Sequence, residues 1–532
     1  MNFLGGQTGY ELFAIEARKR SYVDKTMLID AVYRYAMETN RYICVTRPRR
    51  FGKSTAANMV AAFFDESTAE ESEKLFSRLA IGSLRKEQDD TLLSCWSMQG
   101  KGKVIRINMI DLLVPEVQSY QDFYQVLHRQ MMDDLKVVYP HLAIGKSSLL
   151  PEALSATGDK FIFVLDEWDA IFEMRFMTEK DKEDYILFLK ALLKDKKYVQ
   201  LAYMTGILPI SKYSSGSPLN MFEEFSAFQD DVLFPWFGLT REEIAQLMEQ
   251  KGMTRPSLEE LAFWYDGYIR SCDGVRVYNP ASVSKALGAG VCRNYWTGTG
   301  PMNEVRDIIQ RNVKDLREDI LRMVGGESLD IRLSGFSVEK SRIITRDEIL
   351  SAMVVYGFLS YYEEQLRIPN HELMIKFQEA LASEPLGLNQ SIMESKKLLR
   401  ATLDRDHEEV ARLLEELHNE KIPFFKYNDE NSLACVVTVG YLAALDKYRI
   451  TREAKAGKGY ADFLFEPLRK TDTAIILELK YGHSAEDALR CIHERDYVQR
   501  FKGWHQVLLV GINYSERTKK HTCLTEVVEQ IS

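Results

Sequence analysis

RYICVTRPRRFGKST, residues Arg41–Thr55, is the stretch that decides the fold. It begins with a short apolar, β-branched run, which predicts a buried strand at about Tyr42–Thr46. It ends in Gly52, Lys53 and Ser54, the last part of the phosphate-loop pattern G-x-x-x-x-G-K-[ST], and the apolar spacing that follows predicts a helix. A strand, a loop and a helix in this order form the context in which backbone N–H groups bind phosphate.

One position departs from this pattern. Arg47 stands where the first glycine is usual, and Pro48 follows it. Pro48 fixes its own φ and lacks an N–H donor, so the tight turn must be made in another way. The guanidinium groups of Arg47, Arg49 and Arg50 are available to contact phosphate or a neighbouring subunit. Because G-K-S-T also occurs by chance, the interpretation needs a second element.

The second element is FIFVLDEWD, an apolar run at Phe161–Leu165 followed by Asp166 and Glu167. A strand buried on both faces ends near the ligand crevice of a parallel α/β sheet. We expect Asp166 to hold Mg²⁺ together with the Ser54 hydroxyl, and Glu167 to orient and deprotonate an attacking water. Thr205, at the end of another predicted strand, is expected to sense the γ-phosphate; a plain strand-end threonine is the alternative.

A pair of acids marks the C-terminal region. GYADFLFEP and TAIILELKYG flank a polar turn and predict a β-hairpin, which carries Asp462 on one strand and Glu478 and Lys480 on the other. Residues i and i+2 share a face, so Glu478 and Lys480 point one way and Leu477 and Leu479 point into a core. A divalent metal bound by Asp462, Glu478 and the Leu479 carbonyl would compensate the clustered carboxylates, and Lys480 would orient water or neutralise charge. A salt-bridged, solvent-facing hairpin is the alternative.

Composition narrows the classes of protein. The chain has 532 residues, of which 45% are hydrophobic and 28% charged, as in globular proteins of about three or four domains. No apolar run predicts a membrane span or a secretion signal, and seven scattered cysteines without a C-x-x-C suit a reducing cytoplasm. The net charge of -9 gives no global attraction to nucleic acid, although residues 451–532 carry 13 Lys and Arg against 12 Asp and Glu.

Eight segments within about Tyr22–Gly300 resemble the AAA-ATPase-like family in that family's order: YVDKTMLI, TRPRRFGKST, VLDEWDAIF, MTGILPISK, FGLTREEI, WYDGYI, VYNPASV and YWTGTG. The family characteristically has arginine at the position of the first glycine, and D-E-Y-D where this chain has DEWD. The resemblance implies a P-loop ATPase core with a small helical lid, and ATP and Mg²⁺ as cofactors. The implied nucleotide-binding residues are Arg47, Arg50, Phe51, Gly52, Lys53, Ser54, Thr55, Asp166 and Thr205, with Ser54 and Asp166 as metal ligands and Glu167 as a catalytic residue.

The C-terminal acids resemble the core of the PD-(D/E)XK nuclease superfamily, whose approach E-x-x-x-G-x-G-x-x-D is matched by EAKAGKGYAD. This resemblance adds Glu453 to the metal ligands Asp462 and Glu478, and makes Asp462, Glu478 and Lys480 catalytic. Many relatives have a glutamine in the following helix, where this chain has Cys491.

The expected fold is α/β, with a P-loop parallel sheet, a helical lid, a helical middle region and a restriction-endonuclease-like α/β domain. The expected bounds are 1–235 for the ATPase core, 236–330 for the lid, 331–425 for the helical linker region and 426–532 for the nuclease-like domain. The expected protein is a cytoplasmic ATPase fused to a Mg²⁺-dependent nuclease. The expected substrate of the nuclease is nucleic acid, with DNA preferred over RNA. A homo-oligomer is possible, and no membrane partner is expected. The alternatives are a switch-type regulatory ATPase whose C-terminal domain binds nucleic acid or protein without cleaving it, and a structural module with both sites inactive.

Overall fold

The computed structural model describes residues 1–85, 94–142, 148–210, 219–226, 232–270, 273–296, 313–324, 326–332, 345–382, 389–418, 430–469 and 471–529. The chain divides into two compact units. The first includes Met1–Tyr295 and Leu350–Tyr362, and the second includes Trp296–Arg332 and Glu363–Ser532. The four-part division expected from the sequence stays a prediction. In the part of the chain that is described, no helix combines the length and the apolar character needed to cross a bilayer.

A five-stranded parallel sheet forms the centre of the first unit, in the order β2-β3-β4-β1-β5. The bounds of its strands are β1 Tyr42–Thr46, β2 Lys103–Asn108, β3 Phe161–Asp166, β4 Val199–Gly206 and β5 Glu223–Phe225. The expected parallel sheet is confirmed, and so is the strand predicted at Tyr42–Thr46. Because all strands are parallel, the carboxyl ends of β1, β3 and β4 meet at one edge of the sheet.

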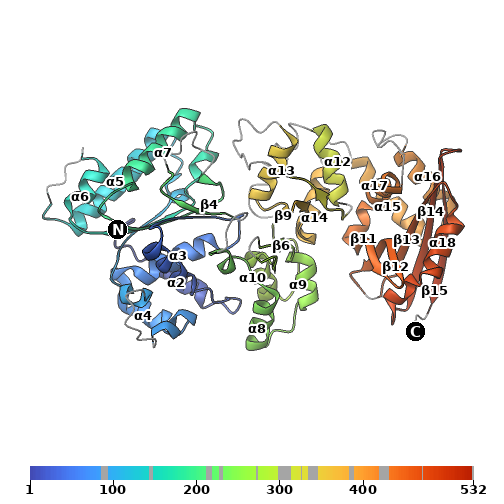
Figure 1. Ribbon diagram of the computed structural model, residues 1–532, viewed down its shortest axis with the longest axis horizontal. Coiled ribbons are helices and arrows are strands. Elements are labelled where there is room, and N and C mark those ends of the chain that lie inside the picture. The colour runs from blue at the N-terminus through green and yellow to red at the C-terminus, as the bar shows by residue number, and fades with distance from the viewer. Residues whose placement is uncertain are drawn as a thin grey trace. The chain divides into compact units, whose positions relative to one another are not determined.

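Helices cover both faces of this sheet (Figure 1). On one side lie α2 (Leu28–Glu38), α3 (Lys53–Phe64) and α4 (Ala69–Phe76), and on the other α5 (Tyr120–Val138), α6 (Leu150–Ala156) and α7 (Glu179–Leu193). The N-terminal helix α1 (Thr8–Ala17) packs on α3. Burial on both faces explains why β1 and β3 are buried at every position, and why their sequences are continuous apolar runs instead of alternating ones.

Residues 232–295, here called the lid segment, follow the sheet in the first unit. They form α8 (Arg241–Lys251), α9 (Leu258–Tyr265), the short hairpin β6 (Tyr268–Ile269) and β7 (Arg276–Val277), and α10 (Pro280–Ala289). A capping box of Thr240 and Glu243 begins α8, and Gly252 ends this helix in the left-handed conformation. Ile244, Leu261 and Tyr265 are fully buried in the core of this segment.

The second unit contains a mixed sheet in the order β11-β12-β13-β14-β15. Its strands are β11 Tyr448–Ala456, β12 Gly459–Pro467, β13 Ala474–Tyr481, β14 Gln506–Ser515 and β15 Lys520–Glu529. Strands β13 and β14 are parallel and the other neighbours antiparallel, so the hairpin predicted from GYADFLFEP and TAIILELKYG is confirmed as β12 and β13. The helix α18 (Ala485–Glu494) connects β13 to β14 and packs on both.

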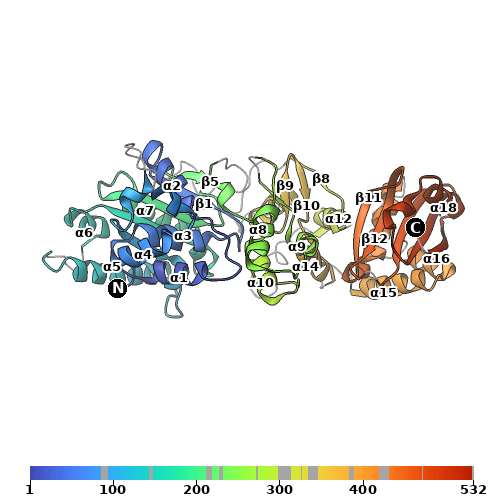
Figure 2. The ribbon, with the colours of Figure 1, turned by 90° about the horizontal axis from the view of Figure 1, so that it is seen from below.

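Further helices complete the second unit (Figures 1 and 2). The helix α16 (His407–Glu416) packs on β15, α17 (Glu430–Gly440) packs on β13, and α15 (Asn389–Leu403) packs on both helices. The remaining elements in the middle of the chain are α12 (Val313–Val324), β8 (Leu329–Asp330), α13 (Arg346–Val355), β9 (Ser360–Tyr362), β10 (Gln365–Arg367) and α14 (His371–Ala382).

Candidate functional site

The phosphate loop joins β1 to α3. Gly52 caps α3 in the left-handed conformation, with φ +86°, and no atom lies within 4 Å of the position that a Cβ would take. Glycine is therefore required here by its backbone conformation. Lys53, the first residue of α3, is buried, and its ammonium donates to the carbonyls of Arg47 at 3.0 Å and Pro48 at 3.1 Å. The N-terminal N–H groups of α3 thus lie next to open space and a buried cation, as an anion site requires.

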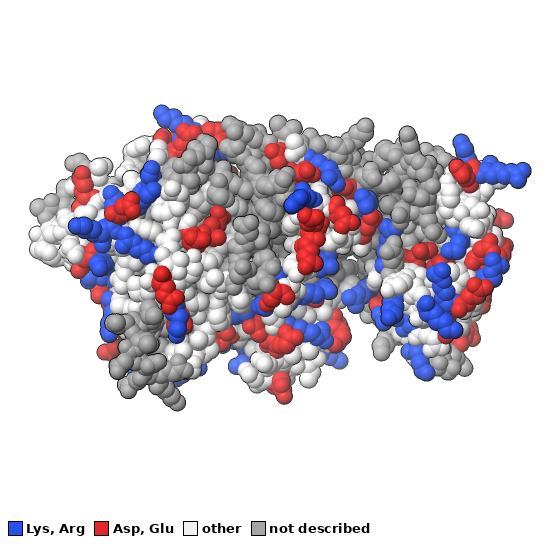
Figure 3. Space-filling model, in the orientation of Figure 1, with Lys and Arg blue, Asp and Glu red and all other residues white. Residues whose placement is uncertain are grey.

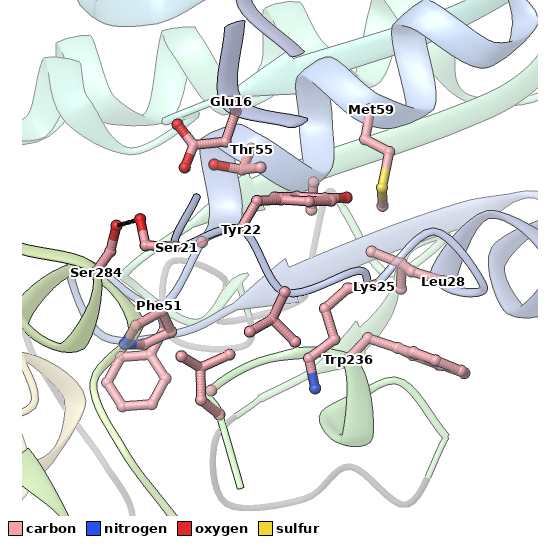
Figure 4. Close-up of a pocket in the computed structure, with 16 residues that line it drawn as sticks. Glu16, Ser21, Tyr22, Lys25, Leu28, Phe51, Thr55, Met59, Trp236 and Ser284 are labelled. Atoms are coloured by element: carbon pink, nitrogen blue, oxygen red, sulfur yellow. Dashed lines mark hydrogen bonds between the residues drawn. The ribbon is translucent and has the colours of Figure 1, made fainter. Parts of the chain in front are cut away.

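Lys53 lines a cavity of about 350 Å³ at the N-terminus of α3. The cavity brings together several of the residues expected to bind nucleotide, together with the expected base: Arg50, Gly52, Lys53, Ser54, Thr55 and Glu167. It also contains residues that sequence reasoning missed: Glu16 of α1, Lys19 just after this helix, and Pro280, Ala281, Ser284 and Lys285 of α10. Glu16, Thr55 and Ser284 also line the adjoining pocket that Figure 4 shows. The four residues of α10 have the spacing of one helix face, so this pattern was a usable signal.

Two acids end β3 beside this cavity. Asp166 is fully buried, and its Oδ1 accepts a hydrogen bond from the Thr205 hydroxyl; within the described chain its Oδ2 has no hydrogen-bond partner. Thr205 was expected to contact the γ-phosphate, but it is fully buried at the end of β4 and holds Asp166 instead. Glu167 turns into the cavity with φ +53°, and its pKa is raised by burial, an effect opposed by the Lys53 ammonium.

A third acid, Asp169, lies behind the first two. Its Oδ2 accepts the N–H groups of Ile207 at 3.0 Å and Leu208 at 2.7 Å, directly after β4. Burial, followed by the charge of Glu167, raises the pKa of Asp169 to about 7. Burial also lowers the pKa of Lys53, while the nearby carboxylates of Glu167, Asp169 and Asp166 oppose this shift. These acids therefore offset part of the effect of burial on the lysine.

Arg47 requires a correction. It was expected to bind nucleotide, yet its side chain is 1% exposed and lies beneath the loop. The guanidinium donates to the carbonyls of Thr46 and Phe225, both at 2.8 Å, and lies 4.6 Å and 4.9 Å from the ring centres of Phe234 and Phe237. Arg47 therefore joins the loop to β5 and to the lid segment. Its side-chain contacts hold the loop conformation that a tight glycine turn holds in phosphate loops of the usual pattern.

Other loop residues are anchored in the same way. Phe51 is buried, and its ring meets Tyr268 of the lid segment edge-on, with ring centres 4.9 Å apart. Arg50, with φ +71°, donates to the Tyr295 carbonyl at 2.6 Å. Contacts from the lid segment thus fix the conformation of the phosphate loop.

The C-terminal acids lie on β12 and β13 of the second unit. The β12–β13 ladder ends at the pair Phe463 and Leu477. Asp462 and Glu478 are the next residues beyond this end of the ladder, one on each strand, and so stand opposite each other. Here side chains replace backbone pairing: the Asp462 N–H donates to Glu478 Oε2 at 3.4 Å, and the Leu479 N–H donates to Asp462 Oδ2 at 2.6 Å. The expected meeting of the two carboxylates is therefore present.

Lys480 and Cys491 complete this cluster. The Lys480 ammonium donates to Glu478 Oε1 at 3.1 Å and to the Leu479 carbonyl at 2.9 Å, the two groups expected to hold a metal with Asp462. The Cys491 thiol of α18 donates to Glu478 Oε1 at 3.0 Å. Burial and, after it, the Glu478 carboxylate raise the pKa of this thiol to about 11, so the thiol is neutral.

Two families match the two sites. Residues 9–215 match the family described as "Predicted AAA-ATPase", and residues 428–522 match the PD-(D/E)XK nuclease superfamily. The chain carries an AAA-ATPase-like domain and a PD-(D/E)XK nuclease superfamily domain. The first match contains the phosphate loop and the acids after β3, and the second contains Asp462, Glu478 and Lys480.

Individual relatives are distant. The "uncharacterized protein in vnfD 5'region" of Azotobacter chroococcum mcd 1 is 24% identical over 392 residues, which cover 70% of this chain and 68% of the relative. Among solved structures, a Walker-type ATPase of Pyrococcus abyssi has a TM-score of 0.34 and 13% identity, over 66% of this chain and 94% of the other. The ORC2 protein of Aeropyrum pernix, in ADPNP and ADP complexes, has a TM-score of 0.32 and 11% identity, over 69% and 99%.

The donors of the PD-(D/E)XK domain suit a hard cation. Carboxylate and carbonyl oxygens are the ligands that Mg²⁺ prefers, and Asp462, Glu478 and Leu479 supply them. In the described residues no group of three or more His, Cys, Asp or Glu side chains is placed to hold a metal ion. Glu453, the expected third acid, lies in β11, but its side chain is outside the described part of the structure. On the face that Figure 3 presents, basic and acidic side chains are interspersed over this domain.

Proposed function

We propose that the AAA-ATPase-like domain binds and hydrolyses ATP in the cavity at the N-terminus of α3. One observation carries this proposal: Lys53, Ser54 and Glu167 line the same cavity, and the buried Asp166 ends β3 beside it. The loop amides and the Lys53 ammonium bind the phosphates. The Ser54 hydroxyl and Asp166 Oδ2 would hold Mg²⁺, which would neutralise phosphate charge.

Glu167 is the general base of this reaction. Its raised pKa makes the carboxylate a stronger proton acceptor near neutral pH than an exposed glutamate. It accepts the proton of the attacking water, the water oxygen bonds to the γ-phosphorus, and the bond to the β–γ bridging oxygen breaks to give ADP and phosphate. Thr205 and Asp169 act indirectly, because they hold Asp166 and the chain after β4 in place.

We propose that the PD-(D/E)XK domain cleaves phosphodiester bonds of nucleic acid, with DNA as the preferred substrate. We also propose that the protein acts in the cytoplasm. Asp462, Glu478 and the Leu479 carbonyl would hold a divalent metal, which would supply an acidified water and positive charge at the site. Lys480 donates a hydrogen bond to the attacking water or to the phosphate and offsets the developing negative charge. The carrying observation is the convergence of both carboxylates and the lysine at one point of the β12–β13 hairpin.

Mutation separates the two activities. We expect Lys53→Ala to abolish ATP turnover and ATP binding, and Glu167→Gln to abolish turnover while ATP still binds, since general base catalysis contributes roughly 10²–10⁴-fold. Asp462→Ala is the matched control and must leave ATP turnover unchanged. An unchanged ATPase rate in Lys53→Ala refutes the nucleotide site.

The nuclease proposal is tested with the full chain on single- and double-stranded DNA and RNA, with Mg²⁺ or Mn²⁺, in the presence and absence of ATP. We expect metal-dependent cleavage that Asp462→Ala and Glu478→Ala each abolish. Lys53→Ala changes the nucleotide site only and serves as the control for the cleavage chemistry. Cleavage that survives both acidic substitutions refutes the assignment of this site.

A switch-type regulatory ATPase is the second candidate function. In this case the C-terminal domain binds nucleic acid or protein without cutting. The observation in its favour is that the Lys480 ammonium and the Cys491 thiol already donate to Glu478. Side chains of the protein itself thus occupy this carboxylate, with Lys480 supplying an opposite charge. Tight binding to nucleic acid without any metal-dependent nicking supports this candidate over the nuclease.

A further inference from the structure

An exposed aromatic ring lies next to the acids of the PD-(D/E)XK domain and takes no part in the cleavage chemistry proposed for them. Tyr460 is 61% exposed, more than any other Phe, Tyr or Trp side chain in the described part of the chain. It stands two residues before Asp462 on β12, which is roughly 7 Å along an extended strand. A ring at this distance can contact a part of the substrate that adjoins the scissile phosphate.

The backbone that carries this ring is firmly held. The Tyr460 carbonyl accepts a hydrogen bond from the hydroxyl of Tyr497, a fully buried residue, and the Arg495 guanidinium donates to the same hydroxyl at 3.0 Å. The turn between β11 and β12 packs on this segment as well. The Lys458 N–H donates to the Arg495 carbonyl at 2.8 Å, and a Cβ at Gly459 would lie 2.9 Å from Arg495 Cδ. Because its strand is already ordered, Tyr460 loses little conformational freedom when a ligand binds.

Three cations lie around the ring. Lys455 is the cross-strand partner of Tyr460 in the β11–β12 ladder, and side chains in such a pair lie about 4.5–5.5 Å apart at Cβ. Lys458 lies in the turn between the two strands, and Arg495 directly follows α18. All three side chains are exposed. The hydrogen bond to Tyr497 raises the pKa of Arg495, and the charge of Glu478 adds to this shift, so the guanidinium lies within electrostatic range of the candidate metal site.

An exposed ring among cations is the combination that binds single-stranded nucleic acid. A base stacks on the aromatic face, and lysine and arginine pair with the phosphates on either side of it. In a duplex each base is already stacked and paired, so contact with its face costs the energy of taking it out of the stack. The surface around Tyr460 therefore suits an unpaired nucleotide better than an intact duplex.

We propose that the Tyr460 ring stacks on an unpaired base next to the phosphodiester bond that the domain cleaves, while the three cations around it bind the adjoining phosphates. The preferred substrate is accordingly single-stranded DNA. The inference rests on the proposed function, because a scissile phosphate at Asp462 and Glu478 gives the ring its place in the complex. Tyr460 touches the substrate away from the reacting atoms, so it acts on the choice of substrate and not on bond cleavage.

Fluorescence anisotropy of the full chain, in EDTA and at fixed salt, tests the ring with three labelled ligands. These are a DNA strand of mixed sequence, an abasic strand of the same length, which has sugar and phosphate but no bases, and the blunt duplex of the first strand. We expect Tyr460→Ala to raise the Kd for the ordinary strand about tenfold, since stacking of a base on an aromatic side chain has this order of effect. The Kd values for the abasic strand and the duplex must stay within about twofold.

The cations give a different result in the same assay. Lys455→Ala is expected to weaken binding of the ordinary and the abasic strand by the same factor, because the ammonium contacts phosphate and not a base. The slope of log Kd against log salt concentration for the ordinary strand is expected to fall by about 0.7, the value for one phosphate contact on a single strand. A loss in Lys455→Ala that is confined to the ordinary strand overturns the assignment of this lysine to phosphate.

Two variants control the experiment with the ring. Leu468→Ala removes a side chain that is 43% exposed directly after the other end of β12, and must change none of the Kd values. Tyr460→Phe keeps the ring and must retain most of the affinity for the ordinary strand. An unchanged affinity in Tyr460→Ala overturns the stacking subsite, and so does an equal loss on the abasic strand.

Failure of the cleavage proposal is seen separately. A chain that binds the ordinary strand through Tyr460 but does not cut it with Mg²⁺ or Mn²⁺ retains the stacking subsite and refutes the nuclease. A wild-type chain that binds none of the three ligands refutes both.

Discussion

Replacing Arg47 with glycine restores the usual phosphate-loop pattern, and we expect it to damage the protein. The side chain of Arg47 is buried below the loop, where its guanidinium donates to two carbonyls and lies against two phenylalanine rings. Glycine removes all four contacts and leaves the carbonyls of Thr46 and Phe225 without these donors. The loop loses its connection to β5 and to the lid segment.

The size of the effect follows from these contacts. A hydrogen bond from a charged donor is worth roughly 1.5–3 kcal/mol, and a desolvated cation–π contact about 0.5–2 kcal/mol. Because the contacts share one guanidinium they do not add fully, and we expect a net loss of about 3–5 kcal/mol. The entropy of unfolding grows with the number of residues, so for a unit of this size the loss lowers the Tm by roughly 4–8 °C.

Differential scanning calorimetry without nucleotide measures this loss, and titration with Mg·ATP measures the site. Arg47→Lys keeps the charge without the planar fork and is expected to fall between wild type and Arg47→Gly. Arg49→Ala removes a half-buried guanidinium that bonds to Glu173 and is the control, with a Tm change of about 1 °C or less. A glycine variant with normal Tm but weakened ATP binding refutes the reasoning, because Arg47 would then act on phosphate directly.

Three further predictions concern the lid segment, acid stability and the cluster around Glu478. Lys285→Ala is expected to weaken Mg·ATP binding about fivefold in calorimetric titration, the effect of roughly 1 kcal/mol from an exposed charge, while Lys251→Ala has no effect. The Tm of the second unit is expected to fall as pH drops from about 6.5 toward 4, because the unfolded chain binds protons that the buried imidazoles of the folded chain do not bind. At pH 5 this difference lowers the free energy of unfolding by about 2 kcal/mol for each of the two most buried rings. His505→Gln is the control and must leave the pH profile unchanged. The imidazoles concerned have pKa values lowered by burial, to about 4 in His371 and His418 and to about 3 in His521. Alkylation of Cys491 by iodoacetamide at pH 8 is expected to be slow and to become several-fold faster in Glu478→Gln, which removes the charge that raises the thiol pKa, whereas Cys292 must react at an unchanged rate.

Each of these predictions has a contrary result. Equal ATP affinity in Lys285→Ala removes the lid contribution to phosphate binding. A Tm that is level between pH 7.5 and 5 contradicts the neutral burial of the three imidazoles. Cys491 alkylation that is as fast in wild type as in Glu478→Gln contradicts the thiol–carboxylate contact.

Local sequence was enough for the elements that carry both sites. The β-branched run at Tyr42–Thr46 and the apolar run before Asp166 are strands because each is buried on both faces, and burial of that kind is visible as an unbroken apolar run. The alternation around Glu478 predicted its common face with Lys480 for the same kind of reason, since the period of a strand is two.

The roles of single side chains required distant parts of the chain. Arg47 looked like a phosphate ligand because the loop pattern gives only its neighbours in sequence. Its actual partners, Phe225, Phe234 and Phe237, follow almost 180 residues or more later. Thr205 likewise reads as an exposed strand end until β4 is placed next to β3, which puts Asp166 in reach of its hydroxyl.

The sequence by itself thus determined which chemical groups are present. They are a glycine at a left-handed helix cap, a lysine directly after it, and acids at the ends of apolar strands. These are properties of short segments, set by backbone conformation and by the period of burial. The tertiary structure decided which charges face a cavity and which serve as supports, because burial and hydrogen-bond partners depend on segments far apart in the chain. It alone revealed Lys285 beside the candidate nucleotide cavity, and the Lys480 ammonium and Cys491 thiol on Glu478.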